Sequence, residues 1–323
     1  MAGAGQLTNV FDSYDVVGAR EELSDLISDI SPTDTPFLSN IGSESTGNTY
    51  FEWQTDALAA AGENHNIDGF DITTYTAVTA TARIGNYTSV LEKDFLISGT
   101  EEAMTKAGRA SEVAYQTTKK AKELKRDQEV NLTANNAAVA GDGTTARETG
   151  GLLAWLKTNT NKSATNGTDP VWTSAPTGAR SDGVARAFTE TILKDVIKQC
   201  YDEGGEPSML MVGSFNKQAA SAFAGIAAQR YMAPGSSPTT IIGAADLYLS
   251  DFGTLSIVPN RFSPSNAALA IDPDLARRRI LRPYKLTPLA KTGDADKYML
   301  TIEEGLQIDN EKGHGIAADL TTS

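Results

Sequence analysis

The sequence contains one cysteine, Cys200, and two histidines, His65 and His314. A single cysteine excludes a disulfide within the chain. Because the two histidines lie far apart in the sequence, these residues also do not form the closely spaced nitrogen and sulfur ligand set of a zinc cluster. We therefore predict no metal-binding residues.

Long apolar stretches are missing as well. The sequence has no run of about 18 apolar residues, which a membrane-spanning helix would require. Its first residues, MAGAGQLTNVFDSYD, have neither the basic start nor the apolar centre of a signal peptide. The sequence thus predicts a protein that is made and kept in a cytoplasm and has no membrane partner.

Positive charge is scarce relative to negative charge. Lys and Arg total 28 against 41 Asp and Glu, which gives a net charge of −13. This balance disfavours a sequence-specific nucleic-acid binder or a protein of anionic membranes, because both gain affinity from a basic surface. A length of 323 residues with 40% hydrophobic residues predicts a soluble chain with about two domain-sized cores.

Motifs that carry chemistry are also lacking. The segment 251–253 reads Asp-Phe-Gly, as in kinases, but no glycine-rich loop or HRD segment accompanies it, so we predict a turn between strands. Neither His65 nor His314 lies in the context of a catalytic triad. Glu303 and Glu304 would point to opposite faces of a strand, as a solvated pair. We predict no catalytic residues, no cofactor and no enzymatic activity.

The most distinctive stretch is residues 100–136, which contain no proline and one glycine. We predict one long helix from Ser98 to Asn136, since Ser98 and Glu101 have the spacing of a capping box. Such a helix would be roughly 55 to 60 Å long, so the molecule should be elongated or flat. Lys125 and Arg126 have the spacing for ion pairs with Glu129.

The segment before this helix begins with an expected amphipathic helix at Val17–Ile30. Pro32 and Pro36 predict an extended chain over Ser31–Phe37, because a residue before proline avoids the helical region. This arrangement is typical of an arm that fastens to another molecule. The alternative is a tail tethered to its own subunit.

Two strands with a period of two follow. In TYFEWQT, Phe51 and Trp53 share one face, and AVTATARIG alternates over residues 77–85. The acidic residues 55–76 between them are too many for a tight turn. A two-stranded ribbon is only marginally stable by itself, so we expect it to lie on a neighbouring chain. The alternative is a pair of ordinary edge strands.

The second half of the sequence predicts a compact α/β domain. Residues 141–187 read as loops around one short strand in GGLLAWL, and residues 189–201 as a helix with a buried Cys200. Ser214 is the expected cap of a helix that carries Phe223 and Ile226. Further strands are expected at MLMV, TLSIV and ALAID, and two short strands in KYMLTIEEGLQIDNEKG.

One basic patch interrupts the acidic chain, formed by Arg277, Arg278, Arg279 and Arg282. It could contact nucleic acid, but in an acidic chain it more often meets carboxylates of the same or a neighbouring subunit. We favour contacts of these arginines with carboxylates at an interface over contacts with nucleic acid. The candidate inter-subunit contacts are Phe37, Phe51, Trp53, Arg126, Arg277, Arg278 and Arg279.

Several long segments, in this order, resemble the major capsid proteins of tailed bacteriophages, in the SU-ten-type group of the Hong Kong ninety-seven capsid fold. The resemblance covers nearly the whole chain. Its longest motifs are REELSDLISDISPTDTPFLSNIG, EWQTDAL, GRASEVAYQTTKKAKELKRDQEVNL and DFGTLSIVPNRF, followed by LRPY, LAKTGD and NEKGHG.

The resemblance implies an α+β fold with five parts. Residues 1–45 would be an N-terminal arm, residues 46–97 an extended β-hairpin loop, and residues 98–185 a peripheral domain with a long spine helix. Residues 186–288 would be an α/β axial domain, and residues 289–323 would return to the peripheral domain. The chain begins almost directly at the arm, so we expect either a separate scaffold or a processed form.

The resemblance also implies a function. The protein would self-assemble into pentamers and hexamers of an icosahedral head that encloses double-stranded DNA, without sequence-specific contact. Portal, scaffold and decoration proteins would be partners, and assembly would occur in the cytoplasm of the host bacterium. The alternatives are the shell of a cellular encapsulating compartment, which holds protein cargo, and an α/β hydrolase.

Overall fold

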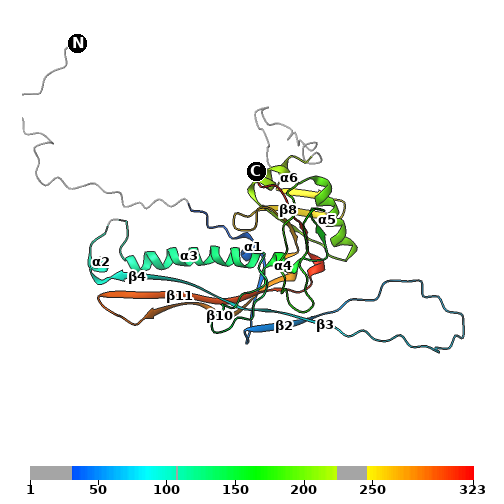
Figure 1. Cartoon of the computed structure of the whole chain (residues 1–323), viewed down its shortest axis with the longest axis horizontal. Helices are drawn as coiled ribbons and strands as arrows, with labels where there is room; N and C mark the ends of the chain where they lie inside the picture. The colour runs from blue at the N-terminus through cyan, green and yellow to red at the C-terminus, as the bar shows by residue number, and fades with distance from the viewer. Residues whose placement is uncertain (1–30, 107, 224–245) are drawn as a thin grey trace, which may run out of the picture.

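The computed structural model describes residues 31–106, 108–223 and 246–323. The helix expected at Val17–Ile30 and the residue Ile226 lie outside these ranges. As predicted, the molecule is elongated: a long arm formed by α3, β4, β10 and β11 extends to one side, and the loop beyond β2 and β3 extends to the other (Figure 1). A compact α/β unit with α5 and α6 lies above them (Figure 1).

The long arm is built on a four-stranded sheet in the order β1-β10-β11-β4. Its strands are β1 (Gly42–Ser45), β10 (Ala276–Leu289), β11 (Ala295–Ile308) and β4 (Ser89–Ser98). The prediction of two short strands near the C-terminus is wrong, because β11 is a single strand of 14 residues. Glu303 and Glu304 do not interrupt it, since both carboxylates find partners inside the protein.

The predicted single spine helix is two helices, α2 (Gly99–Ala103) and α3 (Glu112–Thr133). Ser98 Oγ accepts from the Glu101 amide as expected, but Ser111 starts a second helix by accepting from the Ala114 amide. Gly108, with φ +76°, turns the chain between them. The 22 residues of α3 span about 33 Å, so the expected length was too great.

The GGLLAWL segment also differs from its prediction. It forms the short helix α4 (Leu152–Trp155), whose four residues are all buried. A short apolar run that is buried on every side does not distinguish a strand from a helix by its periodicity. The strand of this region is the two-residue β5 (Thr160–Asn161) further along.

The α/β unit contains a six-stranded sheet in the order β5-β12-β9-β6-β8-β7. The strands predicted at MLMV, TLSIV and ALAID are confirmed, and Thr189 caps the expected helix by accepting from the Ile192 amide. Ser214 does not cap α6, whose N-cap is Gly213. The elements are α5 (Glu190–Asp202), β6 (Met209–Val212), α6 (Ser214–Ser221), β7 (Leu247–Ser250), β8 (Gly253–Pro259), β9 (Ala268–Ile271) and β12 (Gly315–Ala317), with 3-10 turns η1 (Pro273–Leu275) and η2 (Glu311–Gly313).

Alternate side chains of this sheet enter two different cores. Leu210 and Ile257 pack with α5 on one face, where Cys200 is buried as predicted. Met211 and Leu269 face a second core that contains Trp155 of α4 and Phe37 of α1 (Pro36–Asn40). Since this second core draws on the N-terminal segment and on both sheets, it joins the long arm to the α/β unit.

Candidate assembly surfaces

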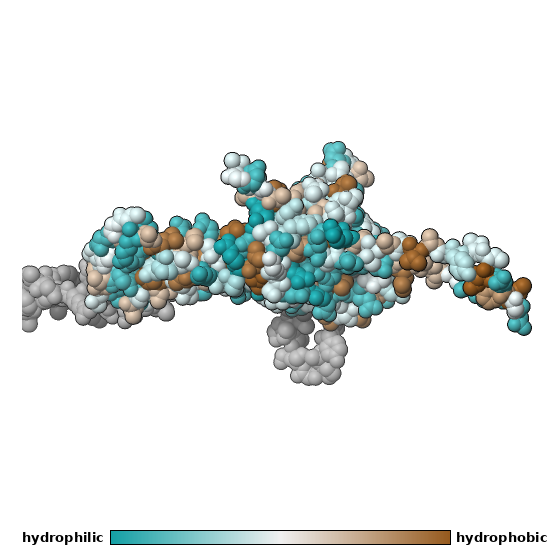
Figure 2. Space-filling view, turned by 90° about the horizontal axis from the view of Figure 1, so that it is seen from below, coloured by the Kyte–Doolittle hydropathy of each residue, from teal (hydrophilic) through white to brown (hydrophobic). Residues whose placement is uncertain are grey.

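The hairpin β2 (Tyr50–Thr55) and β3 (Ala82–Tyr87) carries a loop, residues 56–81, that is exposed along its whole length. The pairing of Trp53 with Ile84 confirms a two-stranded ribbon, although the second strand starts later than predicted. Leu58 and Val78 are 99% and 97% exposed, and Ile67 and Tyr75 are similarly open. Figure 2 shows apolar side chains on this extension. Burial of such side chains against another surface is favourable in free energy, because it removes apolar area from water.

The aromatic residues expected at subunit contacts lie inside their own subunit. Phe37 is completely buried in the core beside α3. Phe51 packs against Gly305, where a Cβ atom would lie 2.7 Å from its ring. Trp53 is half-buried, and its Nε1 donates to the Ile308 carbonyl at 3.0 Å. These three side chains therefore hold the hairpin and the N-terminal segment to their own chain, and a contact of these residues with a neighbouring subunit stays a prediction.

The arginine cluster meets carboxylates of its own subunit, one of the two partners that the sequence left open. Arg279 lies 3.1 Å from Glu44 of β1, and Arg277 lies 3.0 Å from Asp309. Arg278 of the same strand is 3.7 Å from Glu304. Glu44 also lies 3.8 Å from Arg277, so its carboxylate links β1 to β10, with which β1 pairs in parallel. The other two pairs link β10 to Glu304 of β11 and to Asp309 directly after it. Of the predicted contact residues, Arg126 is the one on α3, where it is half-exposed.

Glu303 and Glu304 were expected to be solvated, but both are buried. They do point to opposite faces of β11: Glu303 meets Arg147 and Arg282, and Glu304 accepts from Gln128 at 2.6 Å. Burial raises the pKa of the Glu304 carboxyl. A carboxylate inside a sheet needs such partners, because an unpaired charge there is costly.

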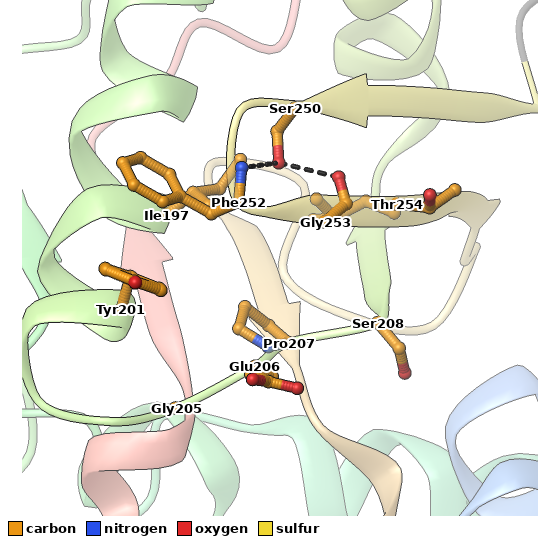
Figure 3. Close-up of a pocket in the computed structure, with 11 residues that line it drawn as sticks. Ile197, Tyr201, Gly205, Glu206, Pro207, Ser208, Ser250, Phe252, Gly253 and Thr254 are labelled. Atoms are coloured by element: carbon orange, nitrogen blue, oxygen red, sulfur yellow. Dashed lines mark hydrogen bonds between the residues drawn. The ribbon is translucent and has the colours of Figure 1, made fainter.

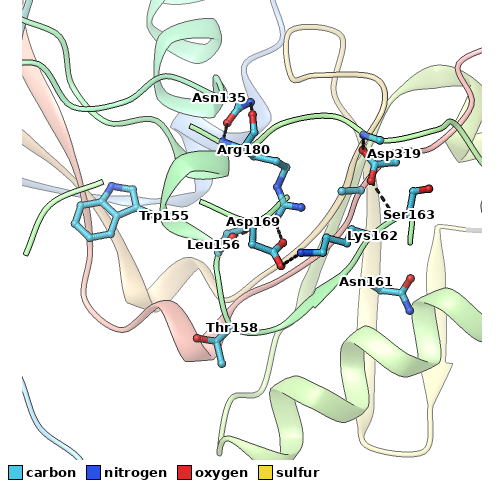
Figure 4. Close-up of polar contacts among 12 residues, drawn as sticks. Asn135, Trp155, Leu156, Thr158, Asn161, Lys162, Ser163, Asp169, Arg180 and Asp319 are labelled. Atoms are coloured by element: carbon cyan, nitrogen blue, oxygen red, sulfur yellow. Dashed lines mark hydrogen bonds and ion pairs between the residues drawn. The ribbon is translucent and has the colours of Figure 1, made fainter. Parts of the chain in front are cut away.

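A second polar cluster ties the loops after α4 together (Figure 4). Arg180 is buried; its guanidinium lies 3.0 Å from Asp169 and donates to the Leu156 carbonyl at 3.1 Å. Lys162 pairs with the other oxygen of Asp169. Asp319, near the C-terminus, accepts from the Ser163 amide at 2.9 Å. These contacts are all internal, so the cluster stabilises the loops.

A cavity of about 180 Å³ lies at the end of α5 and the β7–β8 turn (Figure 3). Of the described residues that line it, Glu206 alone is charged. Ser250 Oγ donates to the Gly253 carbonyl at 2.7 Å, so it is engaged in the turn that the sequence predicted at 251–253. The cavity does not bring together a nucleophile and a base, which a hydrolase would need.

The histidines are not brought together either. His65 lies on the exposed loop, whereas His314 is fully buried and its Nδ1 accepts from the Asp272 amide at 3.1 Å. Burial lowers the pKa of His314 to about 4. Within the described residues, no three His, Cys, Asp or Glu side chains gather as a metal site would require, and no helix there is both long and apolar enough to cross a membrane.

His314 gives a prediction about acid stability. Its folded pKa lies below the unfolded value of about 6.5, so the unfolded chain binds the proton first and stability falls as the pH drops from about 6.5 towards 4. The loss between pH 7.5 and pH 5 should be about 2 kcal/mol. Urea denaturation of wild type and His314→Gln at both pH values measures it. An equal pH dependence in the two proteins would contradict the prediction.

The chain is similar to known proteins in sequence and in fold. The model of the SU10 major capsid protein family matches residues 5–321. This chain belongs to the SU10 major capsid protein family. It is 30% identical to the major capsid protein of Escherichia phage Phieco32, over 95% of this chain and 96% of the relative. The expected family resemblance is thereby confirmed.

Solved structures confirm the capsid fold. The capsid of a native GTA particle matches with a TM-score of 0.62 at 14% identity, over 96% of this chain and 98% of that one. The holo-SrpI encapsulin of Synechococcus elongatus PCC 7942 matches with a TM-score of 0.56 at 10% identity, over 94% of both chains. At these identities the likeness concerns the fold alone. The α+β Hong Kong ninety-seven fold predicted from the sequence is correct.

Proposed function

We propose that this protein is the major capsid protein of a tailed phage and that its copies form the icosahedral head around double-stranded DNA. The family match over residues 5–321 carries this proposal. The geometry supports it: an elongated subunit presents a loop of 26 residues, 56–81, whose large apolar side chains are exposed among the residues that the structure describes.

The loop is the part that we assign to a neighbouring subunit. Its residues Leu58, Ile67, Tyr75 and Val78 would be buried there. Each such contact is modest, but every subunit contributes the same contact and a closed shell sums them. Arg126, half-exposed on α3, remains a candidate for fixing the register between subunits.

The domain assignment needs one change from the expected boundaries. We assign β10 to the peripheral domain, since it pairs with β11 and β1 in the sheet of the long arm. Residues 186–275, which hold α5, α6 and most of the six-stranded sheet, would be the axial domain around the five-fold and six-fold axes.

We extend the proposal to partners and location. Portal and scaffold proteins would take part in assembly in the host bacterial cytoplasm, and decoration proteins could bind the finished shell of the virion. DNA would be held without sequence-specific contact, because a net charge of −13 does not provide the basic surface that such binding uses.

Electron microscopy with sedimentation tests the proposal, on the chain expressed alone and with candidate scaffold proteins. We expect closed shells, or rings of five and six subunits. A monomer under every condition would contradict it. The encapsulin-like fold supports one alternative, a compartment with protein cargo. The contents of purified particles decide between the two, since nuclease-protected DNA supports the phage head and enclosed protein supports the compartment.

A further inference from the structure

A carboxylate of the spine helix begins the short helix of the N-terminal segment. Glu129 of α3 accepts from the Phe37 amide at 2.8 Å and from the Leu38 amide, also at 2.8 Å. These amides belong to the first turn of α1, where the N-cap residue Thr35 makes no side-chain capping bond. Glu129 thus caps α1 from 92 residues away in the sequence.

The same carboxylate is held from the α/β unit. Asn260, directly after β8, donates its side-chain amide to Glu129 at 2.6 Å. The Asn260 backbone amide donates to the Val212 carbonyl at the end of β6, and its side-chain oxygen accepts from the Phe262 amide. Both side chains are buried. Three parts of the chain therefore meet at one carboxylate: the N-terminal segment, the spine helix and the axial sheet.

This arrangement differs from the role that the sequence suggested for Glu129. The spacing predicted ion pairs with Lys125 and Arg126, but Glu129 is turned inward and its described hydrogen-bond donors are all uncharged. Burial raises the pKa of the Glu129 carboxyl. Simple packing would be served better by an apolar residue of similar size.

We propose that Glu129 is a positioning residue for assembly, which sets where the N-terminal arm leaves the subunit and couples that point to the axial domain through Asn260. The inference rests on the proposed function, because the N-terminal arm has a role between subunits only if the chain forms a shell. Residues 31–35 lead directly into α1, so the orientation of α1 sets the direction of this segment. If Asn260 moves with the axial sheet, Glu129 transmits the movement to α1.

Hydrogen–deuterium exchange of the full-length chain tests the coupling, in a peptide that covers residues 36–41. Glu129→Gln should raise its exchange rate at least tenfold, because the glutamine NH₂ group faces a backbone donor. Asn260→Leu should raise it severalfold, because the Asn260 amide holds the Glu129 oxygen that accepts from Phe37 of α1. The matched controls are Glu123→Gln on the same helix and Asn216→Leu, another buried asparagine of the axial part, whose amide donates to the Ser265 carbonyl. Both controls should leave this peptide unchanged.

Exchange in α5 peptides reports any general loss of folding. The coupling is refuted if Asn260→Leu changes the 36–41 peptide no more than Asn216→Leu does. The positioning role is refuted if Glu129→Gln speeds exchange there but assembles into shells as well as Glu123→Gln. Wild-type protein that fails to assemble would contradict the proposed function, whereas the exchange measurement on unassembled chains would still decide the coupling.

Discussion

Replacing residues 56–81 with an Asn-Gly turn should leave the subunit folded and abolish closed shells. Thr55 pairs with Ala82, so a two-residue turn can join β2 to β3. The loop is exposed throughout, and shortening it reduces the entropy cost of closing it. The yield of particles should fall roughly a hundredfold or more, as expected when one of several summed contacts is lost. Thermal unfolding and electron microscopy measure the two effects.

Two variants that keep the full length of the loop distinguish the effect of its side chains from the effect of its length. Serine at Leu58, Ile67, Tyr75 and Val78 together should also prevent assembly, because the four most exposed large apolar side chains of the loop are removed. Serine at Asn64, Asn66, Thr73 and Thr74 should assemble normally. Normal shells from the shortened chain would show that the loop is dispensable and would contradict its assignment to a neighbour.

The sequence predicted those parts of the fold that follow local patterns. Alternation over Tyr50–Thr55 identified β2, and the apolar face of Glu190–Asp202 identified α5. The alternation at Val78 and Ala80 was misleading, since the pairing of β3 with β2 ends at Ala82 and neither residue is in a strand of the described chain. A period of two shows that a segment can form a strand, but the strand forms only where a partner strand lies beside it.

The sequence also contains the signal for the break between α2 and α3, which the prediction of a single helix did not include. Gly108 and Ser111 stand close together, and Ser111 begins α3 as an N-cap. Glu102 of α2 strengthens this start by accepting from the Ser111 hydroxyl and the Glu112 amide. The absence of proline from residues 100–136 does not exclude such a break, because a glycine followed by an N-cap residue ends one helix and starts the next.

The long-range contacts that hold the subunit together could not be predicted from local sequence patterns. Glu129 and Glu304 look like surface residues of a helix and a strand, yet both are buried by partners more than 90 residues away in the chain. Phe37 and Trp53 looked like contacts between subunits for the same reason, since apolar residues on an arm and a ribbon have no local partners. Only the tertiary fold shows that the partners are in the same chain.

Trp155→Ala should be among the most destabilising single substitutions in the chain. Trp155 is fully buried, with the ring of Trp53 5.4 Å away and that of Trp172 5.0 Å away between centroids. It lies in the core shared by the N-terminal segment and both sheets, so the cavity would weaken the junction of the long arm with the α/β unit. We expect a loss of about 3 to 5 kcal/mol in the free energy of unfolding, measured by urea denaturation with circular dichroism. Phe252→Ala, at an aromatic ring that is 42% exposed, is the matched control and should cost less than about 1.5 kcal/mol. If the two substitutions cost the same, the shared core does not hold the two parts of the subunit together.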